Sequence, residues 1–137
     1  MSILREYGVN RISLGMQTFD DDILRTINRT YTGELLEERI QQAREIGFTN
    51  INIDMMYGLP GHTMASMQLD LQKAKNLEVS HLTYYPLYYY DAATLGVTGR
   101  KESNIDSIYA HYDSIVRELT EVGYTQYGRE YFARSST

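Results

Sequence analysis

The sequence predicts an α/β fold whose strands are mainly parallel. Short segments with alternating apolar residues are separated by longer segments with apolar residues at helical spacing, an order typical of βαβ units. The first two predicted strands also carry a polar set of residues opposite their apolar set. The polar sets are Arg11, Ser13, Gly15 and Gln17 in one strand and Asn50, Asn52 and Asp54 in the other. One polar and one apolar face suit an open barrel with a polar inner face, and a solvated edge strand is the alternative.

The predicted elements alternate along the chain. Strands are predicted at residues 10–16, 50–57, 81–88 and 124–132, and helices at residues 20–28, 33–46, 63–77 and 104–122. Thr32 and Thr63 are the expected N-caps of two long helices, and Gly47 and Gly123 end helices. Residues 91–103 form the one candidate flexible segment, which is too short to link two domains.

Composition and charge argue against several classes of protein. The chain of 137 residues has the length of one domain, and its formal net charge is −5. No apolar run reaches the roughly 18 residues of a membrane span and no signal-peptide pattern opens the chain, so we expect a cytoplasmic protein outside the membrane. The acidic balance, and the lack of Lys or Arg among the tyrosines of residues 84–90, argue against nucleic acid as a partner.

Asp54 lies within an otherwise apolar strand, where an unpaired carboxylate costs several kcal/mol. A turn of Gly58, Leu59, Pro60 and Gly61 follows this strand. Ligands of α/β folds collect at the carboxyl ends of the strands, and Gln17, Asp54 and Tyr88 lie near such ends. We therefore expect Asp54 to face a ligand or a cation at the mouth of a barrel.

The sequence contains no cysteine. Disulfides, thiol nucleophiles and an iron–sulfur cluster ligated by this chain are therefore excluded. The three histidines, His62, His81 and His111, have no second ligand at metal spacing. We interpret all three as structural and expect no metal site.

Three blocks of sequence resemble the oxygen-independent coproporphyrinogen III oxidase family of radical S-adenosylmethionine (SAM) enzymes. They are GVNRISLGMQTFDDDILRTINR at residues 8–29, AREIGFTNINIDMMYGLPGHT at residues 43–63 and GYTQYGREYFAR at residues 123–134. The resemblance implies a partial (β/α)6 barrel in which three cysteines hold a 4Fe–4S cluster and SAM is cleaved to a 5′-deoxyadenosyl radical. It further implies that residues 1–137 are one incomplete half of the barrel, from about the fourth strand onward. The cluster-binding N-terminal half and a C-terminal domain would then be absent.

The resemblance also implies cofactor contacts at five positions. Gln17 matches a glutamine that hydrogen-bonds SAM, Arg29 an arginine that pairs with its carboxylate, and Asp54 an aspartate near the ribose hydroxyls. Met56 matches an apolar residue against the adenine, and Tyr88 a small residue whose backbone meets the adenine. Structural roles remain open for three of them: a helix C-terminus for Arg29, a loop hydrogen bond for Gln17 and a neighbouring backbone for Asp54.

Without cysteine this chain cannot hold the family's cluster, so we expect it to be inactive alone. A porphyrin-type substrate is implied by the family, and two departures from its subfamilies, at residues 90–93 and 130–133, leave haem-utilisation and methyltransferase relatives open. The alternative function is a non-catalytic interaction module that self-associates as a homodimer through exposed sheet edges.

Overall fold

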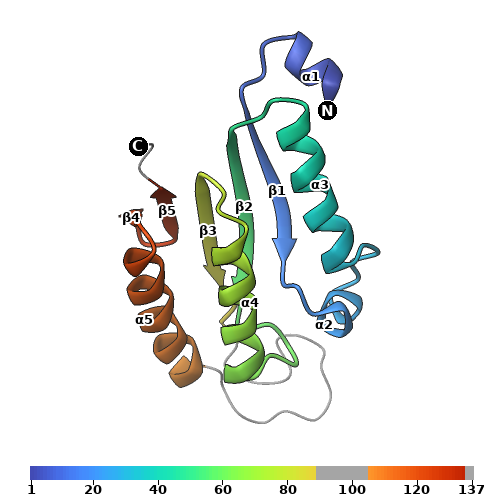
Figure 1. Ribbon diagram of the computed structural model, residues 1–137. Helices are drawn as coiled ribbons and strands as arrows, with labels where there is room; N and C mark the ends of the chain where they lie inside the picture. The colour runs from blue at the N-terminus through green and yellow to red at the C-terminus, as the bar shows by residue number, and fades with distance from the viewer. Residues whose placement is uncertain (89–104, 135–137) are drawn as a thin grey trace.

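The computed structural model describes residues 1–88 and 105–134 as a five-stranded sheet with helices beside it (Figure 1). The strands are β1 (Arg11–Gln17), β2 (Asn50–Tyr57), β3 (His81–Pro86), β4 (Tyr124–Gly128) and β5 (Tyr131–Arg134). The helices are α1 (Ser2–Glu6), α2 (Asp21–Thr26), α3 (Gly33–Glu45), α4 (Met64–Asn76) and α5 (Ile105–Glu121). The candidate flexible segment at residues 91–103 lies outside the described residues.

The sheet has the order β1-β2-β3-β5-β4. The first three strands are parallel, with Ser13 beside Asn52 and Asp54 beside Thr83, and β5 runs antiparallel to β3 and to β4. The prediction of a mainly parallel α/β sheet is therefore confirmed. The alternative of a solvated edge strand fails for β2, which is hydrogen-bonded on both sides.

The last predicted strand is wrong in one respect, because residues 124–132 do not form a single strand. They contain β4 and the first half of β5, which pair with each other as an antiparallel hairpin with a shift in register at Gly128. The hairpin reverses the chain, so β5 rather than β4 lies beside β3. Two smaller differences are the short helix α1, which has no buried residue, and the end of β3 at Pro86 instead of residue 88.

The helices begin and end where their capping residues predict. The Thr32 side chain accepts a hydrogen bond from the Leu35 N–H at the start of α3. Thr63 and Ser66 bond reciprocally at the start of α4, which forms a capping box. Gly47 has a φ of 97° just beyond α3, a left-handed conformation that glycine adopts without a steric cost.

The two faces of the sheet differ in chemistry. Helices α3, α4 and α5 lie on one side of it (Figure 1). The strands direct their apolar residues into this helix-covered core; its fully buried strand residues include Met16, Ile53, Met55, Leu82 and Phe132. The opposite face carries the polar sets that alternate with them. Among the described residues, no helix is long and apolar enough to cross a membrane.

Candidate functional site

Asp54 is held on the polar face of the sheet by two neighbouring side chains. The Ser13 hydroxyl donates to Asp54 Oδ2 at 3.0 Å, and the Asn52 amide donates to Asp54 Oδ1 at 2.7 Å. Side chains rather than a neighbouring backbone thus meet the carboxylate in the described structure. An ionised carboxylate has about four lone-pair positions, so these bonds leave capacity for further donors.

The contacts of Asp54 continue across three strands. Asn52 Nδ2 also lies 2.7 Å from Ser13 Oγ, and the Thr83 hydroxyl donates to Asn52 Oδ1 at 3.1 Å. Asn52 is 4% exposed and Thr83 is 3% exposed, so both ends of this bond are shielded from water. The strand register explains this series of hydrogen bonds, because parallel pairing sets Ser13 beside Asn52 and Thr83 beside Asp54 on the same face.

A hollow of about 370 Å³ lies over this polar floor. Its other lining residues are Arg11, Tyr85, Tyr127 and Tyr131. The three tyrosines form a wall of aromatic rings: Tyr127 stacks on Tyr131 with centroids 5.8 Å apart, and Tyr85 meets Tyr131 edge-on at 6.4 Å. The hollow therefore combines a carboxylate, a guanidinium and exposed aromatic surface.

The pKa values of two groups near this hollow are shifted from their usual range: Tyr85 lines the hollow, and His81 lies against Tyr127. A hydrogen bond with Tyr131, with further contributions from burial and from the charges of Tyr131 and Asp54, raises the pKa of Tyr85 to about 12. Burial, together with the charge of Arg11, lowers the pKa of His81. Both groups are consequently neutral near pH 7, which leaves Asp54 and Arg11 as the charged lining residues.

Gln17 ends β1 at the edge of this face. Its φ is 65°, and the pairing of β1 with β2 shifts in register between Gly15 and Gln17. The Gln17 side chain folds back over Gly15, since its Nε2 lies 2.7 Å from the place a Cβ on Gly15 would occupy. Gly15 is paired with Asp54, so the Gln17 amide and the Asp54 carboxylate belong to neighbouring positions of the sheet.

The remaining predicted contacts lie outside the hollow. Arg29 is exposed, and its backbone N–H donates to the Leu24 carbonyl at 2.9 Å beyond the end of α2. The Tyr31 hydroxyl donates to the Gly15 carbonyl at 3.1 Å, which ties the loop that contains Arg29 to β1. Met56 is half-buried and is paired with Tyr85 in the neighbouring strand.

Tyr88 follows β3 and is half-buried. Its hydroxyl accepts a hydrogen bond from Arg129 Nη2 at 3.0 Å, and its ring packs against the core. The structure therefore brings the Gln17 amide over Gly15, the residue paired with Asp54, while Gln17 itself is paired with Met55. It does not place Gln17, Arg29, Met56 or Tyr88 among the lining residues of the hollow.

Sequence reasoning named Ser13 and Asn52 only as members of a polar face, and it did not select Thr83, Tyr85, Tyr127 or Tyr131. The alternation of polar residues was the available signal for the first two. Thr83 lies in a strand rich in tyrosines, and its position beside Asp54 depends on register. Tyr131 reaches the face because of the unforeseen hairpin.

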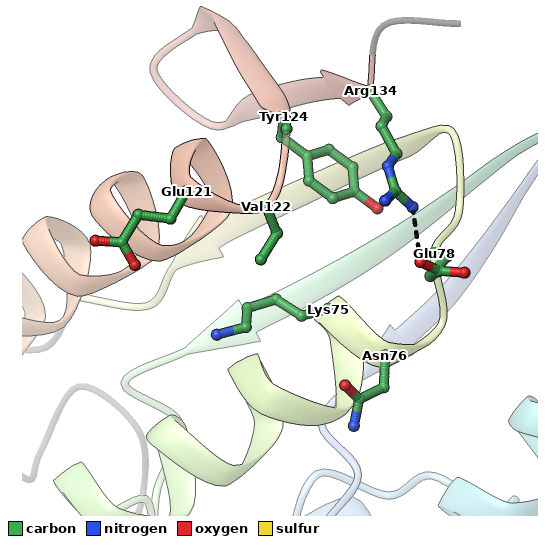
Figure 2. A pocket seen from close by; sticks show the side chains of 8 residues that line it. Lys75, Asn76, Glu78, Glu121, Val122, Tyr124 and Arg134 are labelled. Carbon is green, nitrogen blue, oxygen red and sulfur yellow. Dashed lines mark ion pairs between the residues drawn. The ribbon is translucent and has the colours of Figure 1, made fainter. Parts of the chain in front are cut away.

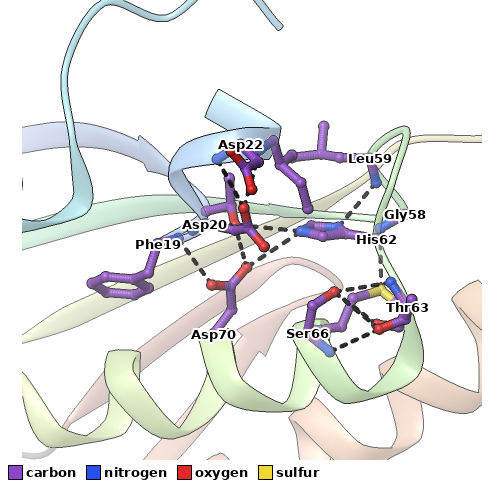
Figure 3. A network of polar contacts seen from close by, with 12 residues as sticks. Phe19, Asp20, Asp22, Gly58, Leu59, His62, Thr63, Ser66 and Asp70 are labelled. Carbon is purple, nitrogen blue, oxygen red and sulfur yellow. Dashed lines mark hydrogen bonds and ion pairs between the residues drawn. The ribbon is translucent and has the colours of Figure 1, made fainter. Parts of the chain in front are cut away.

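A buried polar network lies behind the end of β1 (Figure 3). Asp70 accepts hydrogen bonds from the Thr18 hydroxyl at 2.6 Å and from the Phe19 N–H at 2.9 Å. His62 Nδ1 accepts from the Leu59 N–H at 3.1 Å, and its Nε2 lies 3.4 Å from Asp70. These contacts agree with a structural role for His62, because they join the loops after β1 and β2 to helix α4.

A second and larger hollow, of about 720 Å³, lies where α4 and α5 end (Figure 2). Three of its charged residues form ion pairs: Arg134 lies 3.3 Å from Glu78, and Lys75 lies 2.7 Å from Glu118, which is not a lining residue. The Tyr124 hydroxyl donates to the Val79 carbonyl at 2.6 Å. None of the five predicted cofactor contacts lines this hollow.

No group of three or more metal-ligating side chains occurs in the part of the chain that the structure describes. The whole sequence also lacks cysteine. Soft thiolate ligands, which iron–sulfur clusters require, are not supplied by this chain.

Comparisons with known proteins give consistent relatives. A family model described as "Radical SAM superfamily" matches residues 1–74. The heme chaperone HemW of Lactococcus lactis is 33% identical over 135 residues, which cover 93% of this chain and 35% of that protein. The HemW of Bacillus subtilis is 42% identical over 87 residues, which cover 64% of this chain and 23% of that protein. The oxygen-independent coproporphyrinogen III oxidase of Salmonella typhimurium is 34% identical over 136 residues, which cover 96% of this chain and 29% of that protein.

A solved structure is also similar. The coproporphyrinogen III oxidase HemN from Escherichia coli, described as a radical SAM enzyme, matches with a TM-score of 0.83 and 30% identity over 98% of this chain and 32% of that chain. The chain spans roughly a quarter to a third of the length of these relatives.

Proposed function

The chain belongs to the radical SAM superfamily and has the fold of a segment of the HemN barrel, and from this premise we propose that its polar sheet face binds SAM. The chain would supply the cofactor-contacting part of a HemN- or HemW-like protein. Residues 1–137 would act as one half-domain of the barrel, completed by polypeptide that this sequence does not contain.

The orientation of the Asp54 carboxylate is the main observation that supports the proposal. Its carboxylate is oriented by Ser13 and Asn52 and lines an open hollow. Two adjacent ribose hydroxyls would complete the remaining acceptor capacity of one carboxylate. A hydrogen bond to a charged group contributes about 1.5–3 kcal/mol, so this contact can account for a large part of the binding energy of a nucleoside.

The other predicted contacts have compatible chemistry. Gln17 offers an amide beside Asp54, and exposed Arg29 offers a guanidinium that suits a bidentate pairing with the carboxylate of SAM. Half-buried Met56 offers an apolar surface to the adenine, and Tyr88 would meet it through its backbone. We assign these roles to Gln17, Arg29, Met56 and Tyr88 as parts of the same proposal.

The family's 4Fe–4S cluster does not fit this chain, because the sequence has no thiolate to ligate it. Reductive cleavage of SAM would therefore need cysteines from another polypeptide, and the chain alone would be inactive. The names of the relatives support a tetrapyrrole as the substrate of the completed protein, either a coproporphyrinogen or heme. A haem-utilisation or methyltransferase relative of the same scaffold remains the alternative assignment.

Calorimetric titration of SAM into the purified chain tests the binding proposal. We expect saturable binding that weakens about 10–100-fold in Asp54→Asn, because the variant keeps the shape of the side chain and loses its charge. Asp113→Asn is the matched control, since Asp113 is exposed on α5. Equal affinities of the wild type and Asp54→Asn would contradict the proposal.

A second experiment tests the role as half of a barrel. The chain is combined with a cysteine-bearing N-terminal half from a HemW relative under reducing, anaerobic conditions, and 5′-deoxyadenosine is measured. We expect product only when both polypeptides are present and Asp54 is intact. The absence of product from the combined halves, with the cluster verified by its absorption spectrum, would contradict the half-barrel proposal.

Self-association is a second candidate function. Within the described residues β2 is the only strand that pairs with β1, so no strand covers its outer edge, and such edges promote pairing with another chain. A homodimer would cover that edge. Light scattering at tens of micromolar is expected to give twice the mass of the chain, and a stable monomer would remove this candidate.

A further inference from the structure

Gln17 adopts a backbone conformation that a strand end does not require. Its φ of 65° lies in the left-handed region, and the Thr18 N–H donates across it to the Met16 carbonyl at 2.8 Å. A three-residue turn of this kind, with positive φ at its centre, is rare and strained. Two other non-glycine residues of the described chain have positive φ, but Asn28 and Glu78 follow helices, where this conformation is a common exit.

The two residues after Gln17 are fixed by a buried carboxylate. Asp70 projects from α4, is 4% exposed, and accepts one hydrogen bond from the Thr18 side chain and one from the Phe19 backbone (Figure 3). Because His62 Nδ1 accepts a hydrogen bond from Leu59, the ring proton lies on Nε2, on the side of Asp70. A buried carboxylate with three donors around it resists displacement.

The strained turn places the Gln17 amide over β1. Gly15 has no side chain, and the amide nitrogen of Gln17 occupies the space that a Cβ would need. Gly15 is paired with Asp54. The turn therefore places the amide over Gly15, next to the strand position of the carboxylate that we assign to the ribose, instead of along the continuation of the strand.

We propose that Asp70 is a positioning residue of the cofactor site: it holds Gln17 in the strained turn, so that the Gln17 amide is presented beside Asp54. The inference rests on the proposed function for its ligand and on the hydrogen bonds of Asp70 for its mechanism. Asp70 itself lies in the helix layer and acts through Thr18 and Phe19. Strain at a ligand contact is a recurrent feature of binding sites, where the surrounding structure maintains it.

Thermal unfolding tests the mechanism without any ligand. Gln17→Gly relieves the strain, and we expect it to raise the Tm by about 2–6 °C in the wild-type background. In an Asp70→Asn background the turn is free to relax, so the gain is expected to fall below about a third of that value. Thr18→Val, which removes one donor at nearly constant volume, provides the same comparison if Asp70→Asn does not fold.

Glu78→Gly is the matched control, because Glu78 also has positive φ but lies near the second hollow, away from Asp70. Its effect on the Tm should be the same in both backgrounds. An equal gain from Gln17→Gly with and without the Asp70 contacts would overturn the inference.

SAM titration then tests the functional part. Gly15→Ala places a methyl group where the Gln17 amide lies, and we expect a 3–30-fold loss of affinity with the Tm changed by less than about 2 °C. Asp70→Asn should weaken SAM binding when Gln17 is present and cause no further loss in the Gln17→Gly background. An equal loss in both backgrounds would overturn the positioning role. If the wild-type chain does not bind SAM, the proposed function fails, while the thermal comparison still decides whether Asp70 holds the turn.

Discussion

The side-chain amide of Asn52 lies 2.7 Å from the carboxylate of Asp54, two residues along the same strand. The same amide nitrogen is 2.7 Å from Ser13 on the neighbouring strand. A side chain that donates in two directions couples β1 to β2 on the polar face of the sheet. Together with Ser13, it also sets the direction of the carboxylate.

Replacement of Asn52 should therefore destabilise the fold. We expect Asn52→Ala to reduce the free energy of unfolding by about 1–3 kcal/mol, because Asn52 is buried and Thr83 loses its acceptor. Urea denaturation measures the change. Asn50→Ala, one repeat earlier on the same strand and only half-buried, is the control and should cost less than about 1 kcal/mol. Equal losses for the two variants would show that the contacts of Asn52 contribute no special stability.

Stability should also fall in mild acid because of His111. Burial, together with the charge of His62, lowers the pKa of His111 to about 4 from an ordinary 6.5, although Asp70 and Glu118 oppose the shift. The unfolded chain takes up this proton first as the pH falls. Protonation of His111 therefore costs no stability above about pH 6.5. As the pH falls toward 4, it lowers the free energy of unfolding by up to about 3 kcal/mol.

Denaturation curves at several pH values test this dependence. His111→Phe removes the titrating group and keeps a ring beside Tyr57, whose centroid lies 5.5 Å from that of His111. We expect the variant to flatten the pH dependence between about 4 and 6.5. His81 also has a lowered pKa, so His81→Asn serves as the comparison and should flatten it less. An unchanged slope in His111→Phe would contradict the assignment.

Glu118 joins α5 to α4. Its carboxylate accepts hydrogen bonds from Gln68 at 2.5 Å, Gln72 at 3.1 Å and Lys75 at 2.7 Å. Burial raises the pKa of Glu118, but the bonds from Lys75 and Gln68 outweigh it and hold the pKa below its usual value of 4.5. The stabilisation of the fold by ionised Glu118 is therefore present above about pH 4.5 and is lost as the pH falls further.

We expect Glu118→Gln to cost about 1–2 kcal/mol at pH 7, measured by urea denaturation. Glu121→Gln is the control, because Glu121 lies one turn later on α5 and is exposed. It should change the free energy of unfolding by less than about 0.5 kcal/mol. A cost for Glu118→Gln as small as that of the control would show that the ion pair adds nothing to the packing of the two helices.

Local patterns predicted much of this structure. Alternation set Ser13, Asn52 and Asp54 on one face, and the caps at Thr32 and Thr63 were placed correctly, because period and capping depend on neighbouring residues in the chain. The parallel sheet followed from the order of the elements.

Contacts between distant segments could not be predicted in the same way. Thr83 meets Asn52 through the register of β3, and Tyr131 reaches the hollow because a hairpin reverses the chain near Gly128. The positive φ of Gln17 is imposed by Asp70, which is 53 positions away in the sequence numbering. The contact of Asp54 with Ser13 likewise depends on the register of the sheet.

The ribose hydroxyls of SAM are the partners that we propose for the Asp54 carboxylate. The most direct measurement compares the affinities of SAM and its 2′-deoxy analogue for the wild type and for Asp54→Asn. We expect removal of the 2′-hydroxyl to weaken binding to the wild type about 10-fold and to have little effect on binding to Asp54→Asn, because the hydroxyl and the carboxylate are partners. The same loss in both proteins, or no binding of SAM to the wild type, would contradict the assignment of Asp54 to the ribose.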